Sequence, residues 1–301
     1  MAYNVESLPQ YIEQHKDELV GKTVLNAKTL KYINIQTGVK GKTALNNAIA
    51  DIVFQDGSTC GFSDAGSMAI SQRYFEPHYI KVNMSLCPKD LKDKFLNTEI
   101  VLAAKGQTLP AEEAITNEIV AAINNKLDCE IWAGEGTEGH VKGFYHTITG
   151  DSIAHTAETG TTATNWLKSV YMAIPSDVIE SGKEVAIFVS TGVYREYVME
   201  NSDAYNNPAT YGDGWCYLKG TNVKIIGMQG IDAIKTVYGQ DKAYAGAVDN
   251  FYFGTDMVGD AETFELFFDN SDRVFKFVCE FCGDTQVRFP DKIVNSTRNN
   301  A

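Results

Sequence analysis

The sequence predicts an α+β fold in which some parts extend beyond one compact body. Three observations predict it: one long amphipathic helix, a middle section in which helix and strand patterns alternate, and strand-rich segments near both ends. The chain has 301 residues, which suits one large domain or two ordinary ones. Hydrophobic residues make up 44% of it, so we expect a sizeable core and not a disordered chain.

The charge balance excludes two classes of protein. The chain has 39 acidic and 26 basic residues, a net charge of −13. Proteins that grip nucleic acid by neutralising phosphates need clustered Lys and Arg, and basic membrane-surface helices need them too. The N-terminal residues Met1 to Leu8 lack the pattern of a signal peptide, and no apolar run approaches the roughly 20 residues that span a bilayer. We therefore expect no membrane partner and a reducing, cytoplasmic setting for the six cysteines.

The first 86 residues are predicted to form two projecting parts. A short helix starting at Ser7 and ending at Gly21 has one apolar side, which needs a surface to pack against. Beyond it, two strand-like runs at about 48–54 and 68–86 flank a polar, glycine-containing tip at 56–67. A projecting hairpin cannot bury both faces on its own body and is marginal alone. We therefore expect it to be buried against another chain.

The clearest predicted helix follows a shorter one at 87–96. Thr108 is its predicted N-cap, Pro110 lies in its first turn, and Gly134 follows its end. Its apolar stripe recurs every four residues, at Ile115, Ile119, Ile123, Leu127 and Ile131. The remaining patterns predict a helix around Trp166 that stops at Pro175, strands at 185–190 and 223–228, a helix at 192–199, a loop at 201–221, strands at 264–268 and 274–281, and an edge piece at 287–294 containing Pro290.

Three histidines are the best candidates for chemistry. His140, His146 and His155 fall close together in sequence, near Glu138 and Asp151. Two histidines and a carboxylate can bind a metal, but none of these pairs has the i, i+4 spacing of a helical metal site. The alternative interpretation is that they are ordinary loop histidines. A metal-dependent enzyme that uses this region is therefore a minor hypothesis.

Two further motifs favour structural interpretations. Cys279 and Cys282 fit C-x-x-C, but no second pair completes a zinc site, and a strand places residues three apart on opposite faces. Residues 134–139 fit G-x-G-x-x-G, yet a helix precedes them where the dinucleotide fingerprint needs a strand. We interpret the cysteines as buried strand residues and the glycines as a helix end and turn. We predict no catalytic, cofactor-binding or metal-ligating residue and no enzymatic activity.

The order of the parts resembles that of major capsid proteins of tailed bacteriophages with the Hong Kong 97-like fold. The stretches that carry the resemblance are Ile35–Lys40 through Phe62 and Gly66, Cys87–Leu91, Glu130–Gly136 with Lys142–Phe144, Asn250–Asp256, the strands within 264–281, and Gln286–Pro290. The resemblance implies an N-terminal arm at 1–45, an extended β-hairpin loop at 46–86, a peripheral domain with a long spine helix at 87–139, an α/β axial domain at 140–255, and peripheral C-terminal strands at 256–301.

The resemblance also implies a function. It indicates a structural coat protein that self-assembles as hexamers and pentamers into an icosahedral head around double-stranded DNA, assembled in the host cytoplasm and located in the virion. The implied partners are other copies of the chain, a separate scaffolding protein, a portal and decoration proteins. The runner-up hypothesis is an encapsulin-type nanocompartment shell, which shares the fold.

Some proteins of this family cross-link a loop lysine to an asparagine of a neighbour. The present chain has no lysine between Val53 and Ile80, across the whole predicted loop tip. We therefore predict that assembled particles dissociate in denaturing gels to single chains of 33.1 kDa. A ladder of covalent multimers from boiled, reduced particles would contradict this prediction.

Overall fold

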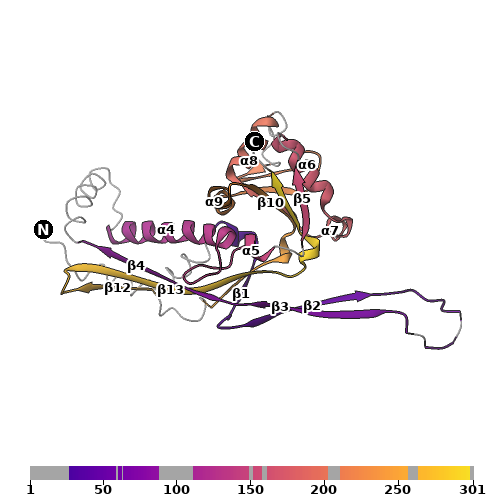
Figure 1. Cartoon of the computed structure of the whole chain (residues 1–301), viewed down its shortest axis with the longest axis horizontal. Coiled ribbons are helices and arrows are strands. Elements are labelled where there is room, and N and C mark those ends of the chain that lie inside the picture. Colours follow the sequence, from indigo (N-terminus) through magenta and orange to yellow (C-terminus); the bar gives the residue numbers. More distant parts are fainter. Residues whose placement is uncertain are drawn as a thin grey trace.

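A computed structural model describes residues 27–58, 60–62, 64–87, 111–148, 152–157, 161–202, 211–256 and 264–298. The predicted helices at 7–21 and 87–96 lie outside the described residues, apart from Cys87. Figure 1 shows three parts: a long sheet with one helix along it, a second sheet with helices on both sides, and a two-stranded hairpin that extends away from both.

The long strand β13 (Val274–Val287) organises the first sheet. Its residues 275–283 pair with β4 (His78–Leu86) along one edge. Along the other edge it pairs with two strands in turn, at 274–279 with β12 (Phe264–Asp269) and at 283–287 with β11 (Phe251–Thr255). The strand β1 (Asn34–Thr37), inside the segment predicted as an arm, adds to β11 in parallel register. Segments from both ends of the chain therefore meet in one sheet.

The predicted long helix is α4 (Ala111–Ala133), which runs along this sheet (Figure 1). Three members of its predicted stripe, Ile123, Leu127 and Ile131, are buried in one core with residues of β13. Ile119 is partly buried against the same core. The expected helix and its buried face are confirmed.

The second sheet has seven strands and is mixed. Its order is β5 (Ile153–Ala157), β14 (Val294–Arg298), β10 (Asp241–Ala247), β6 (Val185–Ser190), β9 (Lys224–Met228), β8 (Trp215–Tyr217) and β7 (Tyr211–Gly212). The helices that contact it are α6 (Ala163–Ala173), α7 (Ser176–Glu180), α8 (Thr191–Glu200) and α9 (Gln229–Tyr238). The short helix α5 (Phe144–Thr147) contacts α4 and β13 instead, and the chain also has 3-10 turns η1 (Thr29–Lys31), η4 (Val248–Asn250) and η6 (Pro290–Lys292).

The position of β6 between two hydrophobic cores explains why its sequence is an unbroken apolar run. Ala186 and Phe188 belong to the core shared with α4 and α9, whereas Ile187 and Val189 belong to a separate core under α6 and α8. Successive side chains point to opposite faces, so a strand covered by helices on both faces needs apolar residues throughout. The predicted strand at 185–190 is confirmed, with helices on both of its faces.

The predicted hairpin is wrong in its second strand. Residues 68–86 form two strands, not one: β3 (Ser67–Phe75), which pairs with β2 (Thr43–Asp51), and β4, which pairs with β13. The break is at Glu76 and Pro77. Proline has no N–H for a ladder and restricts the residue before it, so the chain changes sheets there.

The prediction for the C-terminal residues also needs correction. We expected an edge strand at 287–294, but Pro290 begins η6. The chain then enters β14, an interior strand between β10 and β5. The segment 256–301, predicted as peripheral strands, is therefore divided between the two sheets. The predicted loop at 201–221 likewise includes the short strands β7 and β8.

The two sheets are joined where α4 crosses α9. Asp128 of α4 is buried, and its carboxylate accepts hydrogen bonds from the Thr29 N–H (2.9 Å), the Thr29 hydroxyl (2.5 Å) and the Gly230 N–H (3.2 Å). The indole of Trp132 donates to the same Thr29 hydroxyl at 2.7 Å. A buried carboxylate is tolerated only with several donors, so this cluster fixes how α4, α9 and η1 meet.

Gly230 allows this close crossing. A Cβ at this position would overlap the carbonyl oxygen of Asp128 and lie 2.5 Å from the Trp132 ring. We expect Gly230→Ala to lower the free energy of unfolding by about 2–4 kcal/mol, because two backbones must separate, although alanine favours the helix by up to about 1 kcal/mol. Urea unfolding measures this. Gly41→Ala, which would add a Cβ with nothing within 4 Å, is the control. Equal stabilities of the two variants would contradict the prediction.

Candidate assembly surface

One face of the β2–β3 hairpin is apolar and exposed. Residues paired across an antiparallel ladder lie on the same face, and Ala48 pairs with Ile70 while Ala50 pairs with Met68. The side chains of Ile70 and Met68 are 72% and 65% exposed. Beyond the ladder, Ile52, Val53, Phe54 and Phe62 are exposed as well. An exposed apolar face of this kind marks an interaction site.

The hairpin is buried only at its base. There Phe75 is fully buried and Asn47 is 3% exposed, whereas β3 is exposed from Ser67 to Gln72. Figure 1 shows β2 and β3 leaving the rest of the chain and continuing outward as a pair. A two-stranded sheet is marginal in water without a surface to cover it. The hairpin therefore needs a partner along most of its length.

The base is attached to the end of β13 through side chains. The Asn47 amide donates to the Arg288 carbonyl at 2.6 Å, and the Arg288 guanidinium donates back to the Asn47 amide oxygen at 3.2 Å. Gln286 donates to the Tyr74 carbonyl at 2.8 Å and accepts from the Arg73 guanidinium at 2.9 Å. These bonds position the hairpin relative to the sheet, which its own two-stranded ladder does not join.

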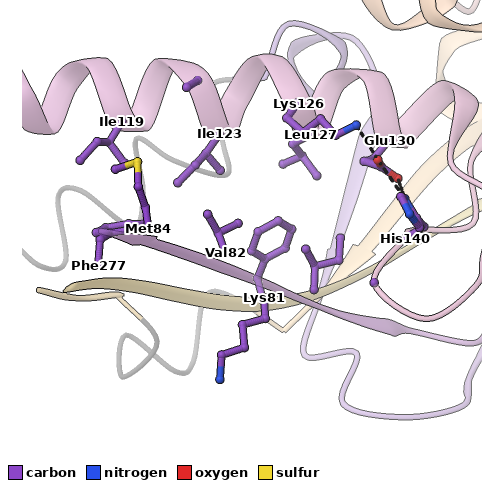
Figure 2. A pocket seen from close by; sticks show the side chains of 14 residues that line it. Lys81, Val82, Met84, Ile119, Ile123, Lys126, Leu127, Glu130, His140 and Phe277 are labelled. Carbon is purple, nitrogen blue, oxygen red and sulfur yellow. Dashed lines mark hydrogen bonds and ion pairs between the residues drawn. The ribbon is translucent and has the colours of Figure 1, made fainter. Parts of the chain in front are cut away.

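A second uncovered feature is an apolar groove between α4 and the sheet (Figure 2). It has a volume of about 320 Å³. Ile119, Ile123 and Leu127 point into it from the helix, opposite Val82 and Met84 of β4. Lys81 points away from the groove in Figure 2 and forms an ion pair with Glu280 at 2.7 Å.

One end of the groove is polar. The carboxylate of Glu130, 9% exposed, contacts the ammonium of Lys126 at 3.2 Å and Nδ1 of His140 at 3.1 Å (Figure 2). Each charged group therefore has a partner within the chain. The groove combines an apolar floor with a paired polar end, and it contains no unpaired group poised for proton transfer among the lining residues drawn in Figure 2.

The three candidate histidines have separate partners. His140 contacts Glu130, His146 contacts the Tyr238 hydroxyl at 2.9 Å, and His155 contacts the Ser296 hydroxyl at 2.8 Å. Within the described parts of the chain, no group of three or more His, Cys, Asp or Glu side chains is arranged to hold a metal ion. The three histidines are therefore close in sequence but do not form a shared site.

The cysteine pair lies in the strand as expected. Cys279 and Cys282 are both buried in β13, and burial raises the pKa of the Cys279 thiol to about 11. A thiol of this kind stays protonated near neutrality and is a poor nucleophile. The interpretation of these residues as buried strand cysteines is confirmed.

The glycine motif is a helix end and turn, also as expected. The Gly134 N–H completes the last turn of α4 by donating to the Glu130 carbonyl, and the Gly136 N–H donates to the Val141 carbonyl. Gly136 and Gly139 have φ of +69° and +82°, values that favour glycine. The tight return of the chain after α4 explains these glycines without a cofactor.

Comparison of the sequence with protein-family models and with curated proteins finds no match. Solved structures do match. A structure from Mycobacterium phage Ogopogo has a TM-score of 0.58 at 9% identity over 90% of this chain and 91% of that one. The satellite phage P4 procapsid with its size determination (Sid) protein has a TM-score of 0.56 at 11% identity over 100% and 93%. A virus-like particle from Pyrococcus furiosus has a TM-score of 0.52 at 10% identity over 98% and 100%.

The chain has a capsid-protein fold. The likeness covers nine tenths or more of the present chain in each of these comparisons, so it is not confined to one shared motif. The fold expected from the order of parts in the sequence is confirmed. Among the helices that the structure describes, none is both long and apolar enough to cross a membrane.

The sequence predicted that the hairpin would need a partner but did not identify its interacting face. The signal was present in the spacing of Ala48, Ala50 and Ile52 at every second position and in Met68 and Ile70 two positions apart, although Ile49 interrupts the alternation. That alternation defines a face only once the register of β2 with β3 is known.

Proposed function

We propose that this protein is a structural major capsid protein of a tailed bacteriophage. In this proposal it assembles as hexamers and pentamers into an icosahedral head that encloses double-stranded DNA, and it acts without enzymatic activity. The capsid-protein fold supports the proposal, and the uncovered apolar face of the β2–β3 hairpin carries it. An exposed apolar face of this kind is typical of a surface that binds other protein chains.

The energetics favour other copies of the same chain as the partner. Burying an Ile, Met or Phe side chain contributes roughly 1.5–3 kcal/mol. The hairpin exposes Ile52, Phe54, Phe62, Met68 and Ile70 on each chain. In a shell every copy both offers a hairpin and receives one, so this contribution recurs at each subunit contact and couples the stability of the chain to assembly.

The negative charge fits a container for DNA. A wall that carries −13 per chain repels the polyanionic genome and has no need for sequence-specific contacts. Enclosure then depends on the shell as a physical barrier. We place the mature protein in the virion, after assembly in the host cytoplasm.

Further partners belong to the same proposal. A separate scaffolding protein, a portal and decoration proteins are the partners that a phage head of this kind would use. The solved P4 procapsid includes a size determination protein, which supports the idea that an additional protein directs shell size in relatives with this fold.

The second candidate is a nanocompartment shell of the encapsulin type. This second candidate is supported by the likeness to the Pyrococcus furiosus virus-like particle, which covers nearly all of both chains. The two functions differ in content, because a phage head protects DNA from nuclease and a nanocompartment holds protein cargo. A metal-dependent enzyme is not favoured, since the three histidines are separately hydrogen-bonded.

Electron microscopy of the expressed chain, alone and with a co-expressed scaffold, tests the proposal. We expect closed particles of uniform size, and in particles taken from infected cells we expect nuclease-resistant DNA. Particles that hold protein and no DNA in their natural host would favour the nanocompartment. A stable monomer that turns over a small substrate and never forms particles would contradict both shell functions.

The hairpin face gives a sharper prediction. Ile70→Asp places a charge on the exposed apolar face, and we expect it to change the unfolding free energy of the free chain by less than about 0.5 kcal/mol while abolishing particle formation. Ser71→Asp adds the same charge one residue away, on the opposite face, and serves as the control. Light scattering measures assembly and urea unfolding measures stability. Normal particles from Ile70→Asp would contradict this use of the face.

A further inference from the structure

The attachment of the hairpin contains one buried acid. The strand β4 pairs with β13 as far as the pair His78 and Gly283, and the chain leaves for the hairpin just before this pair, at Glu76. The next residue of β13, Asp284, is only 1% exposed. Its carboxylate accepts hydrogen bonds from the Glu76 N–H at 2.7 Å and from the Thr285 N–H at 2.9 Å. Asp284 thus contacts the point where the hairpin joins the body.

Asp284 is one of three side chains that attach the hairpin. Asp284 and Gln286 lie two positions apart in β13, so their side chains share one face of the strand, and Arg288 follows directly after the strand ends at Val287. Gln286 bonds to Arg73 and Tyr74, and Arg288 bonds to Asn47, as described above. We call Asp284, Gln286 and Arg288 the hairpin seat. The hairpin is also attached by an apolar contact, in which the buried ring of Phe75 packs against Gly254 of β11.

The seat is suited to open and close as a unit. Its contacts are individual side-chain hydrogen bonds and not a shared backbone ladder, because β2 and β3 form a separate sheet. Opening it would expose Asp284 to water without breaking the pairing of β13 with β4 or β11. A change in the state of Asp284 can therefore move the hairpin while both sheets stay intact.

The charges around Asp284 do not compensate for its burial. Lys142 lowers its pKa and Glu76 raises it, and the two donated N–H bonds lower it, but burial outweighs them and raises the pKa to about 7. Glu76 is itself held by Lys42 at 3.0 Å and has His78 nearby, while Arg73 and Arg288 are committed to Gln286 and Asn47. No guanidinium or ammonium group among the described residues forms an ion pair with Asp284 within 4.0 Å.

We propose that Asp284 makes the hairpin seat a proton-dependent latch, which holds the β2–β3 hairpin against β13 when the acid is protonated and loosens when it is ionised. Because the angle of the hairpin sets where its apolar face meets another molecule, the latch would make that placement sensitive to pH. The inference concerns the single chain, so it does not depend on the proposed shell function.

The direction of the effect follows from linkage. Asp284 has a higher pKa when seated, about 7, than the ordinary value of 3.8 expected once it is exposed. Between these values the seated state binds more protons, so its population is greatest in acid and falls as the pH rises toward 7. The whole pKa difference corresponds to a change of at most about a thousandfold in the ratio of seated to loosened hairpins.

Distances measured by pulsed electron paramagnetic resonance test the latch. One spin label goes on Cys60, exposed beyond the hairpin ladder, and the other on Met199→Cys, exposed on α8, with Cys87 and Cys129 replaced by serine. The unassembled full chain is measured at about pH 5 and about pH 8, on either side of the pKa of Asp284. We expect a narrow distance distribution at the lower pH and a broader or shifted one at the higher pH.

Two substitutions and one control variant show whether the pH response comes from Asp284. Asp284→Asn, which cannot ionise, should give the narrow distribution at both pH values, and the exposed control Asp291→Asn should keep the response of the parent chain. Gln286→Ala weakens the seat without removing the acid and should broaden the distances while keeping the pH response. A parent chain whose distances are equal at the two pH values overturns the proposal even if a variant fails to fold, and so does a pH response that persists in Asp284→Asn.

Discussion

The pairing of β13 with three other strands is the constraint on which the rest of the structure depends. This one strand places β4 on one edge and β12 and then β11 on the other, so segments from residue 78 to residue 287 are aligned by a single ladder system. Because β11 also pairs with β1, the first described strand of the chain is fixed by strands from its second half. Such pairing over long sequence separations costs loop-closure entropy, which the burial of the faces must offset.

The second requirement is that two different sheets share one core. Trp132 at the end of α4 contacts Phe144, Phe188 and Tyr244, with ring centroids 5.1 to 5.4 Å apart. Phe188 and Tyr244 belong to the second sheet, whereas α4 lies on the first. The cluster of aromatic rings and the buried Asp128 carboxylate therefore hold the two sheets as one body. Among the described elements, the β2–β3 hairpin alone remains outside this body, attached through the three side chains of its seat.

Local patterns in the sequence predicted the elements whose cause is local. The isoleucine spacing predicts α4, and the unbroken run at 185–190 predicts β6, because burial on one side of a helix or on both faces of a strand repeats within a few residues. The exit of β3 at Pro77 and the interior position of β14 were missed. Both depend on which distant strand is available for pairing, and no short window of sequence contains that information. The same reason hid Asp284, whose hydrogen-bond partner Glu76 lies more than 200 positions away in the sequence.

The exposed apolar residues of the β2–β3 hairpin also have no explanation within their own part of the chain. The chain exposes Ile70, Met68 and two phenylalanines to water, and each of these exposed apolar side chains loses the free energy that its burial would contribute. The hairpin's apolar face is not compensated anywhere on the described chain, because β2 and β3 have only each other. Under the proposed shell function, another copy of the chain covers this face, and the placement of that contact depends on the hairpin seat. In that case a few hydrogen bonds at the base of the hairpin set the geometry of assembly, while its strength comes from apolar residues farther out.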